Sequence, residues 1–175
     1  MKRFLPALPA LAFAAFLPAA AQDMQGMAAN CAAPASLPPA LSGWAAKTAL
    51  ASATQESGLE AAMLTPGRAA DVTLHPTRKV NYVAQPEKPG GSVAHGGMVA
   101  VAIAEAGIYQ ISLSSGAWID VLKDGAPVIS SAHAPGPPCS GIRKTVQFPL
   151  PPGRAVIQIS ANADPAIQIM VSRVP

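Results

Sequence analysis

Hydrophobic and polar residues alternate along much of the C-terminal half of the chain, from residue 98 to residue 174. In residues 108–114, Tyr109, Ile111 and Leu113 fall on one face of an extended chain, and polar side chains fall between them. This two-residue period is typical of a β-strand with one buried face. The same alternation recurs in residues 155–160 and 167–172. Glycine and proline residues separate the runs, so the segment is predicted to form a β-meander.

A two-residue turn signal divides the middle of this segment. Asp124 and Gly125 join residues 117–123 to residues 126–130, and this pair is typical of a β-hairpin turn. Pro127 cannot donate a backbone hydrogen bond, so the second strand of the hairpin is predicted to lie at a sheet edge. Further short strands are predicted at residues 72–74, 80–83, 98–104 and 145–150.

In all, about eight short strands are expected, and no long helix interrupts them. Residues 132–139 contain three prolines and are predicted to be a loop. The pattern predicts an all-β fold, a single antiparallel β-sandwich, with a jelly-roll barrel as the rival arrangement.

The chain begins with the pattern of a secretory signal peptide. Lys2 and Arg3 precede an apolar run over residues 4–17, and Ala19 to Ala21 offer a small-residue cleavage site. The run is shorter than the roughly 20 residues that a bilayer span needs, so no membrane span is expected after cleavage. The protein is therefore predicted to be periplasmic or secreted.

Three segments follow from these signals. Residues 1–21 are the predicted signal peptide, residues 22–63 an extended N-terminal tether with an irregular stretch, and residues 64–175 the β-sandwich domain. Between residues 41 and 63, glycines and scattered serines and threonines break any helical stripe. We expect at most a short helix or strand there.

The charge pattern argues against a polyanionic partner. Loss of Lys2 and Arg3 with the leader would leave ten of the twelve basic residues against nine acidic ones, a net charge of about +1. The sequence has no basic run and no basic amphipathic helix. Nucleic acid is therefore not an expected partner.

The chain has two cysteines, Cys31 and Cys139. An exported protein folds in an oxidising compartment, where cysteines present in even number usually pair. A Cys31–Cys139 disulfide is the favoured interpretation. Two free thiols or a metal-binding pair are the alternatives.

From residue 64 onward the sequence resembles the bacterial pre-peptidase C-terminal type of β-sandwich domain. The matching features are Gly67 ahead of residues 72–74, the strands at residues 106–113 and 118–122, and the pattern of Phe148, Leu150, Pro152 and Gly153. Members of that family are accessory secreted domains without catalytic residues. The resemblance therefore implies a non-catalytic module, and we expect it to bind a glycan, a peptide or an envelope partner.

The chain also resembles a group of short secreted bacterial proteins that carry the name homogentisate 1,2-dioxygenase. The matching runs are residues 86–91, 92–97 and 117–121, together with Cys139, Arg143 and Lys144. The long cupin enzymes of that name hold iron with two histidines and a glutamate, and no residue here matches that motif. This resemblance implies the alternative function, a small non-haem-iron dioxygenase with iron bound through His95 and His133.

A non-haem iron site needs two histidines and a carboxylate on one face of the fold. The candidates are His75, His95 and His133, which are far apart in the sequence and form no His-x-His or His-x-Asp pair. The other interpretation is that each histidine lies in a loop and forms local hydrogen bonds.

The strand at residues 118–122 carries the most informative candidate site. Side chains two apart in a strand share a face, so Trp118 and Asp120 point one way while Ile119 and Val121 point toward the core. A tryptophan beside a carboxylate can form the floor of a ligand site. The alternative is that the N-terminal tether covers Trp118, which would make the cluster structural.

Two histidines complete this candidate site. His133 follows the hairpin partner of the Trp118 strand and is expected at the rim, and glycines after His95 suggest a turn near the start of the meander. No catalytic residue and no cofactor is assigned. The predicted ligand-binding residues are Trp118, Asp120, His133 and His95.

Overall fold

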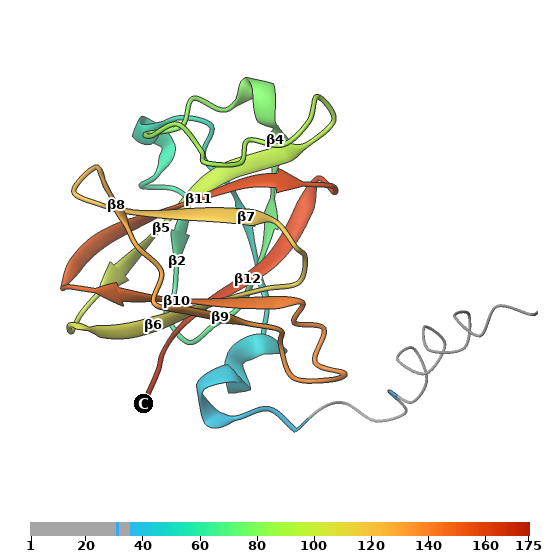
Figure 1. Cartoon of the computed structure of the whole chain (residues 1–175), viewed down its shortest axis with the longest axis vertical. Helices are drawn as coiled ribbons and strands as arrows, with labels where there is room; N and C mark the ends of the chain where they lie inside the picture. The colour runs from blue at the N-terminus through green and yellow to red at the C-terminus, as the bar shows by residue number, and fades with distance from the viewer. Residues whose placement is uncertain (1–30, 32–35) are drawn as a thin grey trace, which may run out of the picture. The chain divides into compact units, whose positions relative to one another are not determined.

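The computed structural model describes residue 31 and residues 36–175 of the chain, so the predicted signal peptide lies outside the described residues. The described residues form twelve strands in two mixed six-stranded sheets, which pack against one another (Figure 1). The all-β sandwich expected from the sequence is confirmed.

We call the two sheets A and B. Sheet A has the order β1-β3-β12-β6-β10-β9, with β1 (Thr48–Ala51), β3 (Ala70–Thr73), β6 (Gly107–Leu113), β9 (Ala132–Ala134), β10 (Lys144–Leu150) and β12 (Ala166–Arg173). Sheet B has the order β2-β5-β11-β7-β8, with β2 (Met63–Leu64), β5 (His95–Ile103), β7 (Trp118–Lys123), β8 (Ala126–Val128) and β11 (Gly153–Asn162), and β4 (His75–Pro76) also pairs with β5. Three 3-10 helices accompany the early strands: η2 (Pro39–Trp44) precedes β1, η3 (Glu56–Gly58) lies between β1 and β2, and η4 (Thr77–Lys79) lies between β4 and β5.

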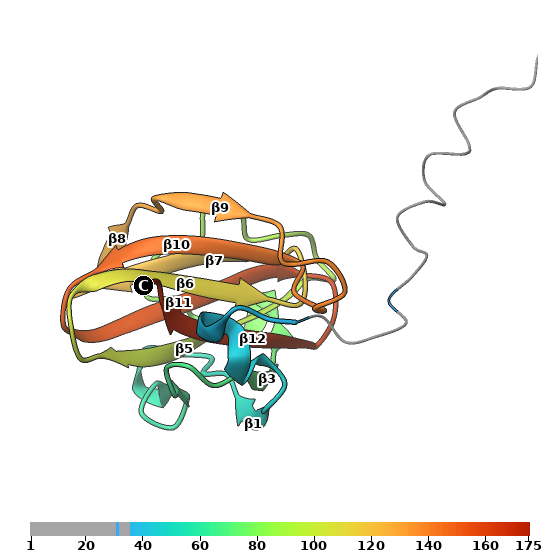
Figure 2. The same cartoon turned by 90° about the horizontal axis from the view of Figure 1, so that it is seen from below.

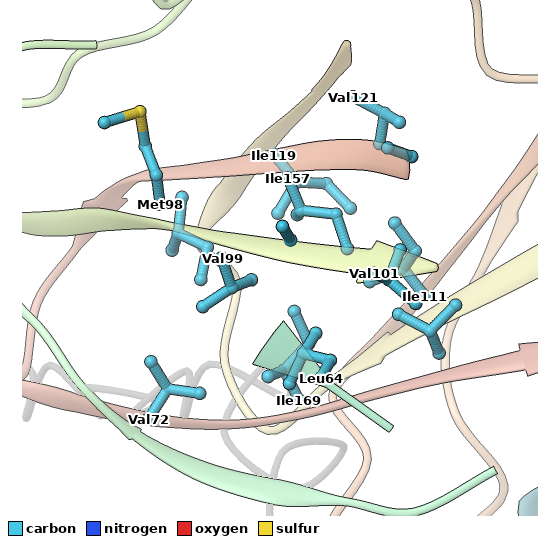
Figure 3. Close-up of a cluster of buried hydrophobic side chains, with 14 of the residues drawn as sticks. Leu64, Val72, Met98, Val99, Val101, Ile111, Ile119, Val121, Ile157 and Ile169 are labelled. Atoms are coloured by element: carbon cyan, nitrogen blue, oxygen red, sulfur yellow. The ribbon is translucent and has the colours of Figure 1, made fainter. Parts of the chain in front are cut away.

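The inward faces of the two sheets meet in one apolar core. Ile111 and Ile169 of sheet A lie close to Ile119 and Ile157 of sheet B, and all four are buried (Figure 3). Burial of each such side chain contributes about 1.5 to 3 kcal/mol to folding. The two-residue hydrophobic period therefore decides which face of each strand turns inward.

The predicted hairpin forms between β7 and β8. Asp124 and Gly125 have φ angles of 52° and 78°, as a two-residue turn that follows the right-handed twist of the strands requires. β8 ends the strand order of sheet B, so the prediction that Pro127 lies in an edge strand is confirmed.

Residues 80–83, predicted as a strand, form a loop instead. The Tyr82 hydroxyl donates a hydrogen bond to the carbonyl of Ile159 at 2.8 Å. The Gln158 side chain exchanges hydrogen bonds of 3.0 and 2.9 Å with the backbone of Ala84. These hydrogen bonds, together with the packing of Tyr82 and Val83 against the core, anchor the loop on sheet B without making it part of the sheet.

Residues 132–134, predicted as part of a loop, form strand β9. They pair with residues 145–147 of β10. All three prolines of the predicted loop come after Ala134, so none removes a backbone donor from the strand. The prediction was therefore wrong for the first three residues of the loop.

The sandwich also includes part of the segment that the sequence left irregular, residues 41–63. β1 pairs in parallel with β3, and β2 pairs in parallel with β5, so the sheets are mixed and not purely antiparallel. Between β1 and β3 the chain passes through β2 in the other sheet. Parallel neighbours need such a crossover, because a hairpin joins only antiparallel strands.

Cys31 and Cys139 are joined in a disulfide, as the sequence predicted. In the part of the chain that the structure describes, we find no helix that is both long and apolar enough to span a membrane.

Candidate binding pocket between the edge strands

The chain passes from sheet B to sheet A along one side of the sandwich, where β8 and β9 lie (Figure 2). β8 pairs only with residues 121–123 of β7. By Ser131, whose backbone N–H bonds to the carbonyl of Gln147 in β10, the chain already belongs to sheet A. Among the described residues, no strand therefore lies beside residues 118–120 of β7 on this side.

A pocket of about 450 Å³ opens in this gap. Its floor is apolar, with Ile119 and Val121 from β7 and Val146 and Phe148 from β10, all four buried. This volume lies within the range of small-ligand sites in proteins. The remaining lining residues are Glu87, Trp118, Asp120, Pro127, Val128, Ile129, Ser130, His133 and Lys144.

Trp118 and Asp120 form a linked pair at the mouth of the pocket. The Trp118 indole Nε1–H donates to Asp120 Oδ1 at 3.0 Å. The backbone N–H of Glu87 donates to Asp120 Oδ2 at 3.3 Å. Each carboxylate oxygen therefore has a donor that fixes its orientation.

Trp118 is only half-buried and belongs to neither apolar core cluster. The Lys88 ammonium lies 4.2 Å from the centre of its ring, and the Lys144 ammonium lies 5.6 Å from it. Both distances suit cation–π attraction. Residues of the 80–91 loop, and not only the strands, therefore hold Trp118 in place.

Lys144 is the cation at the inner side of the mouth. Its Nζ donates to the carbonyl of Ala117 at 2.6 Å. Burial lowers the pKa of Lys144, and the nearby charge of Lys88 lowers it further. Among the described residues, Lys144 forms no salt bridge with a carboxylate. The contacts of this half-buried ammonium with other described residues are a neutral hydrogen bond and a ring contact, so it can bind an anionic ligand group.

His133 lies at the opposite rim. It faces Val146 across the β9–β10 pair, and residues directly opposite in an antiparallel pair share a face. Because Val146 turns toward the core, the His133 side chain turns toward the pocket that both residues line.

His95 lies outside the pocket. It begins β5, where it pairs with Asn162 and Pro76. Its Nδ1 is buried, with no hydrogen-bond partner among the described residues. The structure therefore brings Trp118, Asp120 and His133 to one pocket and leaves His95 elsewhere.

The described residues do not form a metal-binding set. Within residue 31 and residues 36–175, no group of three His, Cys, Asp or Glu side chains is placed to hold one ion. His75 bonds through Nε2 to the carbonyl of Ser52 at 3.2 Å, away from the pocket lining.

Sequence reasoning missed the cations of the site. Lys144 is the first residue of β10 and follows Trp118 by more than 20 residues in the sequence, and Lys88 lies in a loop. Their approach to Trp118 depends on the packing of sheet A and of the 80–91 loop. No local pattern in the sequence signals that packing.

Neither protein-family models nor curated proteins gave a match to this chain.

Proposed function

We propose that this protein is an exported, non-catalytic β-sandwich module that binds its partner in the pocket between β7 and β10. The observation that carries the proposal is the joining of an apolar floor to a polar rim within one pocket of about 450 Å³. Such a combination suits a ligand that has an apolar group and a hydrogen-bonding or charged end. The resemblance to accessory pre-peptidase domains supports the same class of function.

Among the expected partners, a peptide fits this pocket better than a glycan. A sugar ring stacks on an open aromatic face, and Lys88 lies over the ring of Trp118 at 4.2 Å. The floor is built from Ile119, Val121, Val146 and Phe148, which suit an apolar side chain and not a row of hydroxyl groups. A peptide supplies an apolar side chain and backbone polar groups together.

Export is part of the proposal. It rests on the leader pattern of residues 1–21, and the Cys31–Cys139 disulfide is compatible with an oxidising compartment. Detection of the mature chain, beginning near residue 22, in a periplasmic or culture fraction tests this part.

The dioxygenase alternative finds no support in the donor set. Iron of that type needs two histidines and a carboxylate together, and His95 and His133 lie at different places in the fold. No third ligand joins either of them among the described residues. The residues present do not fit the group, and we derive no reaction from it.

The test uses Trp118 as a reporter inside its own site. In a Trp44→Phe variant of the full chain, Trp118 is the one remaining tryptophan. Titration with a pool of short peptides should change its fluorescence in a saturable way, and titration with a mixture of oligosaccharides should not. Saturable binding of oligosaccharides and not of peptides would mean that the partner is a glycan.

A blocking variant links the signal to the pocket. His133→Trp places a large side chain at the exposed rim and should abolish peptide binding, whereas Arg143→Trp, an exposed position outside the pocket lining, should not. For each variant, binding is measured as the shift in melting temperature that added peptide causes. This readout does not depend on tryptophan emission. No binding by the unblocked protein, or equal binding by both variants, would overturn the proposed function.

A further inference from the structure

We infer that the pocket binds the C-terminal end of an extended peptide. In this arrangement the peptide pairs antiparallel with β7 at Ile119, its penultimate side chain enters the apolar floor, and its carboxylate lies beside Lys144. The inference rests on the proposed function and adds the class of partner and the way it is held.

The backbone N–H and C=O groups of β7 point alternately toward β8 and toward β11. In a two-residue hairpin the flanking residues, here Lys123 and Ala126, exchange hydrogen bonds with each other. Counting back from Lys123, the backbone N–H and C=O groups of every second residue point toward the β8 side. These residues are Val121, Ile119 and Ala117. The hydrogen bond from Lys144 Nζ to the carbonyl of Ala117 lies on this same edge and agrees with that count.

Ile119 is the residue of this series that has nothing opposite it. β8 ends at Val128, which pairs with Val121, and the next residues cross to sheet A. Among the described residues, no strand or loop pairs with the outer edge of Ile119. Its N–H and C=O are therefore available to a strand from another chain, the mode known as β-augmentation.

Strand polarity then decides which peptide end lies at Lys144. A peptide antiparallel to β7 runs in the same direction as β8, so its C-terminal end points toward Ala117. Along a strand, Ala117 and Ile119 are roughly 7 Å apart. One further residue past the Ile119 partner brings a terminal carboxylate to the Lys144 ammonium that bonds to Ala117.

The charges of the site agree with this polarity. A carboxylate would give Lys144 the anionic partner that it lacks among the described residues. Asp120 does not supply it: its two oxygens accept N–H groups from Trp118 and Glu87, and among the described residues it forms no salt bridge with Lys144.

The apolar floor of the pocket contacts the side chain of the penultimate peptide residue in this arrangement. The residue opposite Ile119 in an antiparallel pair has its side chain on the same face as Ile119, which turns inward. That side chain meets Val121, Val146 and Phe148. Val128 of β8 already lies opposite Val121, so the peptide pairs with β7 through this one residue and its upstream chain leaves the sheet edge at Val128.

The test compares two forms of one peptide pool on the wild-type full chain. The pool has leucine, valine or phenylalanine at the second-to-last position and is otherwise randomised, and it is made with a free C-terminal carboxylate and with a C-terminal amide. The free acid should bind about tenfold more tightly by calorimetry, because only it forms a charge-assisted contact with Lys144. Methylation of the penultimate backbone nitrogen, which faces Ile119, should also weaken binding about tenfold.

Variants of the protein separate the two parts of the account. Lys144→Gln should remove the preference for the free acid, and Lys79→Gln, an exposed lysine outside the pocket, should retain it. Where Lys144→Gln fails to fold, the acid and amide comparison on the wild type decides alone. Equal affinity for acid and amide would overturn this inference and leave the peptide-binding module standing. Absence of binding to both forms would overturn the proposed function as well.

Discussion

At the scale of single residues, Trp118 has polar and charged neighbours in place of a packed apolar shell. Its indole nitrogen bonds to Asp120, and Lys88 and Lys144 approach its ring. Trp118→Ala should therefore weaken peptide binding at least about tenfold but lower the free energy of unfolding by no more than about 2 kcal/mol. Urea unfolding followed by circular dichroism measures the second quantity. Loss of cooperative unfolding in this variant would mean that Trp118 is a core residue.

Tyr82 gives a second residue-scale prediction. Burial raises the pKa of Tyr82 from 10.0 to about 12. The unfolded chain then loses the phenolic proton first as pH rises, so this contribution to stability is complete below pH 10.0 and is lost between pH 10.0 and about 12. The difference in unfolding free energy between the protein and Tyr82→Phe should shrink over this interval. In a Tyr109→Phe background, ultraviolet absorbance should show the phenolate of Tyr82 forming late, and its appearance near pH 10.0 would contradict the assignment.

How far the sequence predicts the site depends on the range of each interaction. Trp118 and Asp120 share a face because a strand has a two-residue period, and that follows from the sequence alone. Lys88 and Lys144 join them through the packing of a loop and of the other sheet. The residues that a local pattern places were predicted, and those placed by distant packing were not.

At the scale of elements, the β7–β8 hairpin sets the edge of the pocket. Gly125 has a φ of 78°, where a side chain is strained although a methyl group there would meet no neighbouring atom. Gly125→Ala should cost about 1 kcal/mol of unfolding free energy from backbone strain alone. Gly116→Ala is the matched control, because its site is equally open and its φ is not in that range. Equal effects of the two substitutions in urea unfolding would contradict this account of the turn.

Gly96 lets the loop that carries Tyr82 approach sheet B closely. A methyl group at Gly96 would collide with the Tyr82 hydroxyl and with the carbonyl of Ile159, the two groups whose hydrogen bond anchors the loop. Gly96→Ala should therefore speed hydrogen exchange of the Ala84 amide, which bonds to Gln158 in the same loop. An unchanged exchange rate at Ala84 would show that the Tyr82 anchor does not hold this loop.

The elements also show why sequence patterns succeed or fail. The long strands β6, β11 and β12 carry several alternating residues, and their predicted ranges agree with the structure within about two residues. The run at residues 80–83 is too short to distinguish a strand from a loop with apolar anchors. β1 and β2 are short and gain their place from parallel partners that are distant in sequence.

At the scale of the whole molecule, one disulfide closes a loop of more than 100 residues between Cys31 and Cys139. Replacement of both cysteines by serine should lower the free energy of unfolding by about 4 to 5 kcal/mol, because the unfolded chain regains the entropy that the crosslink removes. Urea unfolding with and without reducing agent measures the effect. Equal stability of the oxidised and reduced protein would contradict it.

The central claim is that the partner enters the gap between β7 and β10. Methyl NMR of the full chain during titration with the free-acid peptide pool tests it most directly. The methyl signals of Ile119, Val121, Ile129 and Val146 should shift in a saturable way, because these residues line the pocket. Those of Ile167 and Ile169, buried in β12 and outside the pocket lining, should stay in place. Binding that shifts the signals of other residues and leaves those of the pocket unchanged would contradict the account.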